Sequence, residues 1–190
     1  MEAIDLLKSR RSVLVKNLTS PGPDKEDLQQ ILEVGLRVPD HGKIGPWRIQ
    51  VITPKGQKTL GDLAAKIFTD KYGERATEKQ IEAERQRPQR APVLLIVTSD
   101  IQSQHKIPEL EQRLSGGAVC MNILNAAHAL GYSAQWVTEW LSFDTEIKAA
   151  LGHQDQTDII GMIYIGTAVE PPQPRSRPPL DDIVSEWSGT

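Results

Sequence analysis

The sequence predicts a single α+β domain over residues 1–190, with about four or five strands and helices on both faces of the sheet. Two segments, 91–99 and 158–167, are almost continuously apolar, which is typical of central strands buried on both faces. Between the strands, apolar residues recur at the spacing of amphipathic helices. No internal repeat or linker divides the chain, and 190 residues are enough for one core.

The first half of the chain predicts three helices and one strand. A helix with one buried stripe is expected at 3–9, and Asp24 is expected to cap a second helix that ends near Arg37. Alternating side chains at 47–52 predict a strand, and a third helix is expected around 60–67.

The segment 70–90 is almost entirely charged or polar. Thr77 and Gln80 have the spacing of a capping box, so a helix that buries little is expected there. Such a segment is usually a solvated excursion, and near a ligand site it would serve as a lid or substrate-selecting flap.

The second half predicts strands at 91–99, 133–138 and 158–167. A long helix is expected from Glu109 to Leu130, ended by Gly131, and a short one capped by Asp144 or Thr145. Small residues at 116–118 favour close approach of another helix, across a subunit interface or along the core.

The tail at 170–190 begins with a proline-rich run that is expected to be extended. Because Trp187 and other apolar residues follow, we expect this arm to pack against a partner subunit, with a disordered end as the alternative.

The composition limits the possible function classes. A formal charge of −3 argues against general nucleic-acid binding. Cys120 is the only cysteine, so no intrachain disulfide is possible and a reducing compartment is expected. The longest apolar run, 93–97, is too short to cross a membrane, and the N-terminus does not resemble a signal peptide. We therefore expect a cytoplasmic globular protein.

Two segments carry candidate ligand-binding groups. The loop after the second helix contains Arg37, His41 and Lys43 among glycines. This combination favours a binding site for an anionic, planar ligand over a loop that is polar only because it is exposed. Arg10, Arg11 and Ser12 form either a phosphate clamp or a basic helix end that is stabilised by the helix dipole.

The sequence offers no catalytic side chain with a recognisable pattern. The four histidines are scattered without metal-ligand spacing, no nucleophile elbow is present, and Cys120 lies within a predicted helix. Asp40 and His41 are adjacent and point apart, which does not favour an orienting pair. A ligand loop without an acid–base set is typical of proteins whose cofactor supplies the chemistry.

These features together resemble the nitroreductase family, and most closely its short-chain bacterial branch. The resemblance runs over essentially the whole chain. It includes the RRS segment, the Arg37–His41 loop, the Gly45-Pro46-Trp47 strand entry, the strand containing Trp136 and the proline-rich tail with Arg177.

The resemblance implies a three-layer fold with a central four- or five-stranded mixed sheet, in a homodimer with exchanged C-terminal arms. It implies FMN at two interface sites, reduced by NADH or NADPH and reoxidised by a nitroaromatic, quinone or similar acceptor in ping-pong fashion. The cofactor-binding residues that it implies are Arg10, Arg11, Ser12, Arg37, His41, Trp136, Val137, Thr138 and Arg177.

Two departures from the family pattern concern the site. Relatives often have a polar residue where this chain has Gly45, and an arginine and serine where it has Val137 and Thr138. Two alternatives remain at this point. One is a flavin-binding protein or a specialised flavin chemistry, such as dehalogenation or flavin fragmentation. The other is a cofactor-free hydrolase centred on His41.

Overall fold

The fold was analysed in a computed structural model, which describes residues 2–189. Its helices are α1 (Ala3–Ser9), α2 (Lys25–Gly35), α3 (Pro54–Tyr72), α4 (Glu78–Gln86), α5 (Glu109–Ala129) and α6 (Thr145–Ala150). Its strands are β1 (Leu18–Thr19), β2 (Trp47–Ile52), β3 (Val93–Ser99), β4 (Ser133–Val137) and β5 (Asp158–Ala168). Short 3-10 turns include η2 (His41–Lys43), η4 (Arg87–Gln89), η5 (Trp140–Ser142) and η6 (Leu180–Asp182).

The five strands form one sheet in the order β1-β5-β3-β2, with β4 also paired to β5. Each pairing of described residues is antiparallel, so the expectation of a mixed sheet was wrong. Burial of a strand on both faces often indicates parallel neighbours, but here helices cover both faces of an antiparallel sheet. The apolar pattern therefore predicted that these strands are buried, but not whether their neighbours run parallel or antiparallel to them.

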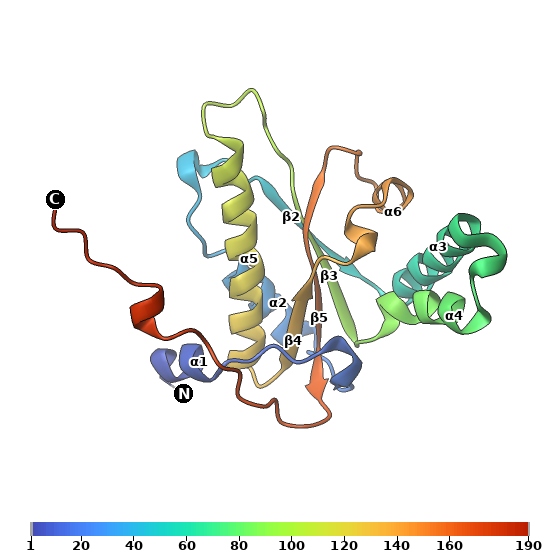
Figure 1. Cartoon of the computed structure of the whole chain (residues 1–190), viewed down its shortest axis with the longest axis horizontal. Helices are drawn as coiled ribbons and strands as arrows, with labels where there is room; N and C mark the ends of the chain where they lie inside the picture. Colours follow the sequence, from blue (N-terminus) through green and yellow to red (C-terminus); the bar gives the residue numbers. More distant parts are fainter. Residues whose placement is uncertain (1, 190) are drawn as a thin grey trace.

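The sheet is the middle layer of three, as the α+β nitroreductase-like prediction required. One face packs against α3 and α6 through a core that includes Leu60, Ile96 and Tyr164. The other face packs against α2 and α5 through a core that includes Ile31, Leu95 and Ile123. Figure 1 shows α5 and the α3–α4 pair on opposite sides of the strands.

Several local predictions of helix ends are confirmed. Asp24 accepts from the Asp27 amide at 2.9 Å, and Thr77 and Gln80 form a complete capping box at the start of α4. Asp144 caps α6 through the amides of Glu146 and Ile147, and Gly131 follows α5 at φ 87°. These ends depend on residues within one turn of each other, which is why local sequence predicts them.

Two expectations about packing can be compared with the single chain. Helix α1 has no buried stripe there, since Ile4 is 58% and Leu7 55% exposed. Helix α4 buries only Glu84, as expected, and it packs closely on α3 at one point, where a Cβ at Gly61 would collide with the carbonyl oxygen of Arg85. The periodicity of apolar residues predicts that a helix has an apolar face, but it does not predict which element packs against that face. A high content of charged residues likewise does not predict which of them form contacts with a neighbouring helix.

Within the single chain, Gly116 and Gly117 of α5 face side chains of the sheet, and approach of another helix across a subunit interface stays a prediction. A Cβ at Gly116 would lie 3.1 Å from Ile160, and one at Gly117 would lie 3.7 Å from Trp136. The close helix–helix contact is elsewhere, at Gly35 of α2, where a Cβ would lie 2.7 Å from Ile123 of α5.

The C-terminal arm leaves β5 and extends past α1 away from the remaining chain (Figure 1). Every described residue from 169 to 189 is exposed, and Trp187 is 87% exposed. The extended conformation agrees with the prediction, whereas exchange of the arm between subunits remains a prediction for the single chain.

Candidate functional site

The segment that follows α1 is held along the free edge of β4. The backbone N–H of Val13 donates to the carbonyl oxygen of Ala134 at 3.2 Å, and that of Val15 donates to Gln135 Oε1 at 2.6 Å. Because both N–H and C=O of an antiparallel residue point to the same side, the backbone groups of Trp136 face this free edge as well. The edge therefore combines polar backbone groups with the adjacent segment Arg10–Ser12.

Three of the predicted arginines come together at this place. Burial lowers the pKa of Arg10, and the positive charges of Arg177 and Arg11 lower it further. Arg10 Nη1 lies 3.5 Å from Ser12 Oγ, while Arg11 and Arg177 donate only to nearby backbone carbonyls. Within residues 2–189, none of these three guanidinium groups forms an ion pair with a carboxylate.

His128 of α5 belongs to the same cluster, and sequence reasoning missed it. Burial, and the positive charges of Arg10 and Arg11, lower the pKa of His128 below its ordinary value. A histidine in the last turn of a long helix gave no signal of this neighbourhood. Guanidinium groups without a carboxylate partner are the kind of groups that bind phosphate, because their forks match its oxygens.

The loop after α2 has three residues in the left-handed region of the backbone. Gly42, Lys43 and Gly45 have φ values of 71°, 56° and 54°, and only the lysine carries the steric cost of that region. Asp40 does not pair with His41, because its carboxylate accepts from the Gly45 amide at 2.9 Å. A side chain at position 45 would have to adopt the left-handed backbone that Gly45 has here.

Helix α5 anchors this loop. His41 Nδ1 lies 2.7 Å from Glu111 Oε2, and Asn122 Nδ2 donates to the carbonyl oxygen of Arg37 at 2.9 Å. A cavity of about 280 Å³ next to His41 is lined by Pro39, His41, Glu111, Leu114, Ser115 and Ala118. The Arg37 side chain itself is exposed.

The loop and the arginine cluster lie at different positions along α5. Glu111 contacts His41 near the helix start, whereas His128 belongs to the arginine cluster near the helix end. Seventeen residues separate these two positions, a rise of about 25 Å at the pitch of an α-helix. The Arg37–His41 loop and the arginine cluster thus lie along the same helix but at its opposite ends.

The Trp136–Thr138 segment offers its backbone more than its side chains. The Trp136 indole lies beneath α5 and donates to the Ile160 carbonyl at 2.9 Å, and Gly161 leaves space for it. Val137 packs into the core on the opposite face of the sheet, and only Thr138 is exposed. An alternating strand exposes at most one face, so these three side chains cannot all face one ligand.

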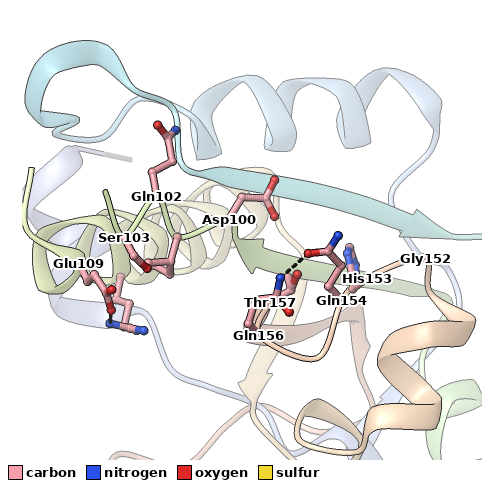
Figure 2. A pocket seen from close by; sticks show the side chains of 11 residues that line it. Asp100, Gln102, Ser103, Glu109, Gly152, His153, Gln154, Gln156 and Thr157 are labelled. Carbon is pink, nitrogen blue, oxygen red and sulfur yellow. Dashed lines mark hydrogen bonds and ion pairs between the residues drawn. The ribbon is translucent and has the colours of Figure 1, made fainter. Parts of the chain in front are cut away.

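A second cavity lies away from the predicted site residues. It has a volume of about 540 Å³ and lies between the loop after β3 and the loop before β5 (Figure 2). Its lining is largely polar, with Asp100, Glu109, Arg113 and His153 among the contributing side chains, and it includes none of the nine predicted site residues. Size alone therefore does not locate the candidate cofactor site.

Other reactive groups are occupied or shielded. Burial raises the pKa of the Cys120 thiol to about 12. Ser115, which borders the cavity beside His41, donates to the Pro39 carbonyl at 2.8 Å and accepts from the Trp47 indole at 3.0 Å. Within the described chain, no group of three or more His, Cys, Asp or Glu side chains is placed to hold a metal ion. No helix among residues 2–189 is both long and apolar enough to span a membrane.

Comparison with known proteins identifies the family to which this fold belongs. The sequence profile of the Nitroreductase family matches residues 7–167, so the chain belongs to the Nitroreductase family. Among curated relatives, the Escherichia coli (strain K12) protein named "Putative NAD(P)H nitroreductase YdjA" is 34% identical over 167 residues, 88% of each chain. A Haemophilus influenzae protein named "Putative NAD(P)H nitroreductase" is also 34% identical, over 173 residues and 90% of each chain.

Solved structures agree on the fold. The nitroreductase-like family protein from Bacillus cereus superposes with a TM-score of 0.86 at 23% identity, covering 100% of this chain and 97% of that one. A nitroreductase from Desulfovibrio desulfuricans, solved in complex with FMN, gives a TM-score of 0.75 at 22% identity, covering 100% and 99%. At these identities the likeness establishes the fold alone.

Proposed function

We propose that the protein is an FMN-dependent oxidoreductase that uses NAD(P)H to reduce nitroaromatic, quinone or similar acceptors. The observation that carries the proposal is the cluster of Arg10, Arg11 and Arg177 without a carboxylate, beside a free strand edge. Membership of the Nitroreductase family, curated relatives named for NAD(P)H nitroreductase activity and an FMN-bound structural neighbour support the same assignment.

The described residues fit FMN in charge and in hydrogen-bonding groups. Arg10, Arg11, Ser12 and Arg177 would hold the phosphate, with His128 beside them. The free backbone edge at Trp136 supplies N–H and C=O groups of the kind that an isoalloxazine edge can pair with. When bound, FMN supplies the hydride chemistry that links a nicotinamide to an acceptor.

In this proposal the protein binds and orients, and contributes no nucleophile. Arg37 and His41 serve as binding residues, because His41 is engaged with Glu111, and the Ser115 hydroxyl that lines the same cavity is already hydrogen-bonded. The hydrolase alternative lacks an activated nucleophile among these groups. A cation or aligned backbone donors near the ring would stabilise negative charge that develops during reduction.

We also propose a homodimer in which each site draws on both subunits. The rise of about 25 Å between the His41 contact and the His128 contact on α5 favours contributions from two chains to one cofactor. The exposed apolar side chains of α1 and of the C-terminal arm, such as Leu7 and Trp187, supply surface for such an interface. A cytoplasmic location is consistent with the buried free thiol of Cys120.

Two measurements test the function. The purified protein should be yellow and release FMN on denaturation, and it should oxidise NADH or NADPH faster when a quinone or nitroaromatic is added. Retained flavin without acceptor-dependent NAD(P)H oxidation would favour the flavin-binding or specialised-chemistry alternative. A colourless protein that does not take up added FMN would contradict the proposal.

A further inference from the structure

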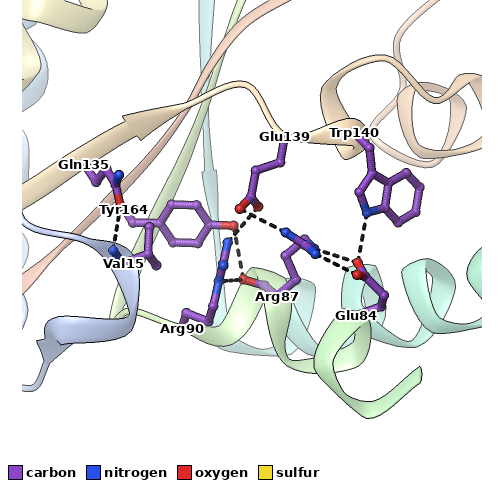
Figure 3. A network of polar contacts seen from close by, with 8 residues as sticks. All are labelled: Val15, Glu84, Arg87, Arg90, Gln135, Glu139, Trp140 and Tyr164. Atoms are coloured by element: carbon purple, nitrogen blue, oxygen red, sulfur yellow. Dashed lines mark hydrogen bonds and ion pairs between the residues drawn. The ribbon is translucent and has the colours of Figure 1, made fainter. Parts of the chain in front are cut away.

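A largely buried network of ion pairs joins the charged segment 70–90 to the residues that follow β4. Glu84 of α4 accepts two hydrogen bonds from Arg87, at 2.6 Å each, and one from the Trp140 indole at 2.9 Å. Arg87 also lies 2.9 Å from Glu139, and Arg90 donates to the other oxygen of Glu139 at 2.7 Å. Figure 3 shows these side chains converging from η4, α4 and the chain that follows β4.

The network is shielded from solvent and balanced in charge. The side chains of Glu84 and Glu139 are 10% and 21% exposed, and those of Arg87 and Arg90 are 22% and 28% exposed. Two carboxylates face two guanidinium groups, so no charge is left over. The hydrogen bonds from Arg87 and Trp140 hold the pKa of Glu84 below its ordinary value against the opposing effect of burial.

The sheet fixes the arginine side of this network. The Arg90 guanidinium lies over the ring of Tyr164, 5.3 Å from its centroid, and the Tyr164 hydroxyl donates to the Arg87 carbonyl at 3.1 Å. Tyr164 belongs to β5 and is fully buried. Arg87 and Arg90 are therefore held by the central strand and not by the solvent-exposed part of the excursion.

The network acts on the part of β4 that the proposed cofactor site uses. Pairing with β5 ends at Val137, so Thr138 and Glu139 lie beyond the strand ladder. The Glu139 carboxylate makes no helix-cap hydrogen bond and is engaged by Arg87 and Arg90 instead. Glu139 follows Trp136 by only three residues, so its position limits how far the free backbone edge of Trp136–Thr138 can shift.

We propose that Glu139, clamped by Arg87 and Arg90, is a positioning residue that sets the Trp136–Thr138 backbone against the isoalloxazine. The inference rests on the proposed function. It gives the charged segment 70–90 a role other than that of a flap. The end of this segment, with Arg87 and Arg90, supports the backbone edge of Trp136–Thr138 from the opposite face of the sheet. The contact residues of the cofactor are unchanged, and their orientation depends on the clamp.

The test compares Glu139→Gln with Glu82→Gln in the FMN-loaded protein. Glu82 lies on α4 and pairs only with the exposed side chains of Arg85 and Gln86, so it is a matched control. Energetic coupling through such networks changes a dependent step by roughly 2- to 30-fold. We expect Glu139→Gln to change the rate of flavin reduction by that factor and to shift the visible flavin spectrum and midpoint potential. The control should leave all three unchanged.

Amide hydrogen exchange reads the backbone directly and needs no cofactor. Thr138 and Trp136 should exchange faster in Glu139→Gln than in the control. If Glu139→Gln does not fold, Trp140→Phe removes one hydrogen bond to Glu84 and should produce smaller changes in the same direction.

The outcomes separate the two proposals. In one outcome, the wild-type protein binds FMN and oxidises NAD(P)H, and the Glu139→Gln variant is less stable but has an unchanged spectrum, potential and reduction rate. This outcome overturns the positioning role alone. A wild-type protein that binds no FMN overturns the proposed function and the role that rests on it.

Discussion

Val15 and Gln135 fasten the N-terminal segment to β4, through the Val15 backbone N–H and Gln135 Oε1 at 2.6 Å. The bond joins residues 120 positions apart and fixes where Arg10 and Arg11 lie relative to the strand edge. A replacement that cannot accept a hydrogen bond should loosen this placement, although Gln135 has no predicted contact with the cofactor.

We therefore expect Gln135→Met to weaken FMN binding. A typical hydrogen bond contributes about 0.5–1.5 kcal/mol, so the dissociation constant should rise by roughly 2- to 12-fold. Fluorescence quenching of FMN by the apo-protein measures this change. Gln29→Met, which removes only an exposed side-chain bond to Glu33, is the control and should bind FMN as the wild type does.

Arg10 should contribute the largest single effect on phosphate binding. A hydrogen bond to a charged group contributes about 1.5–3 kcal/mol, so Arg10→Ala should weaken FMN binding by about 10- to 150-fold. Arg10→Lys should recover only part of the loss, because an ammonium keeps the charge without the bidentate fork. Lys8→Ala, on the exposed surface of α1, serves as the charge-matched control. Equal affinities for wild type and Arg10→Ala would remove Arg10 from the site.

Local signals in the sequence predicted elements and their ends. Asp24, Thr77, Asp144 and Gly131 act within one turn of their helices, and the structure uses them as expected. The same local character explains the gathering of Arg10 and Arg11, which are neighbours in the chain. Arg177 joined them in the prediction only through the family resemblance.

Contacts between distant segments were not predictable in the same way. The Arg90–Glu139 pair spans 49 residues, and neither residue stands out among the charged residues of the sequence. The family resemblance implied that the segment with Trp136 lies against the flavin, but it did not show that the Trp136 indole fills the space left by Gly161 beneath α5. Such relationships depend on strand register and on which helix covers each face, and neither follows from periodicity.

The stability of the apo-protein at acidic pH should depend on His128. Burial and the charges of Arg10 and Arg11 lower the pKa of His128, so in the apo-protein its protonation opposes folding. The unfolded chain then binds more protons, and this contribution to stability is present above the ordinary pKa near 6.5 and is lost as pH falls through the folded value. His128→Gln should reduce the loss of stability on acidification, measured by urea unfolding at pH 7.5 and 5.5.

Bound phosphate should reverse the shift at His128, because an anion favours the protonated imidazole. NMR titration with and without FMN should therefore show the pKa of His128 rising on binding. His153, whose pKa is lowered chiefly by burial and which hydrogen-bonds Gln50, provides an internal control that should not respond. No response at His128 in FMN-bound protein would place the phosphate elsewhere.

Two glycines in helices should respond oppositely to alanine. Gly61 of α3 faces the Arg85 carbonyl, so Gly61→Ala should force α3 and α4 apart and cost about 1–3 kcal/mol as overpacking does. At Gly117 of α5 the nearest atom to a new Cβ is on Trp136 at 3.7 Å, an ordinary contact. Gly117→Ala should instead stabilise the protein by up to about 1 kcal/mol. Urea unfolding of the two variants tests both signs.

The C-terminal arm should stabilise the dimer and the cofactor site together. Leu180, Ile183, Val184 and Trp187 are 62–87% exposed in the single chain, so their burial against a partner would be favourable. Truncation after Pro179 removes all four side chains but leaves Arg177 in place. We therefore expect the truncated protein to dissociate more readily, measured by sedimentation, and to lose FMN at the same protein concentrations.

Trp187→Ala isolates the largest of these side chains. Loss of a central aromatic contact costs about 2 kcal/mol or more, so the dimer dissociation constant should rise by at least roughly 30-fold. Glu186→Gln changes a neighbouring charge without removing apolar surface and should leave the dimer intact. Flavin loss should follow the fraction of monomer in every variant, because each site of the proposed dimer draws on two chains. A truncated protein that remains a dimer with full FMN occupancy would show that the arm covers neither the interface nor the cofactor.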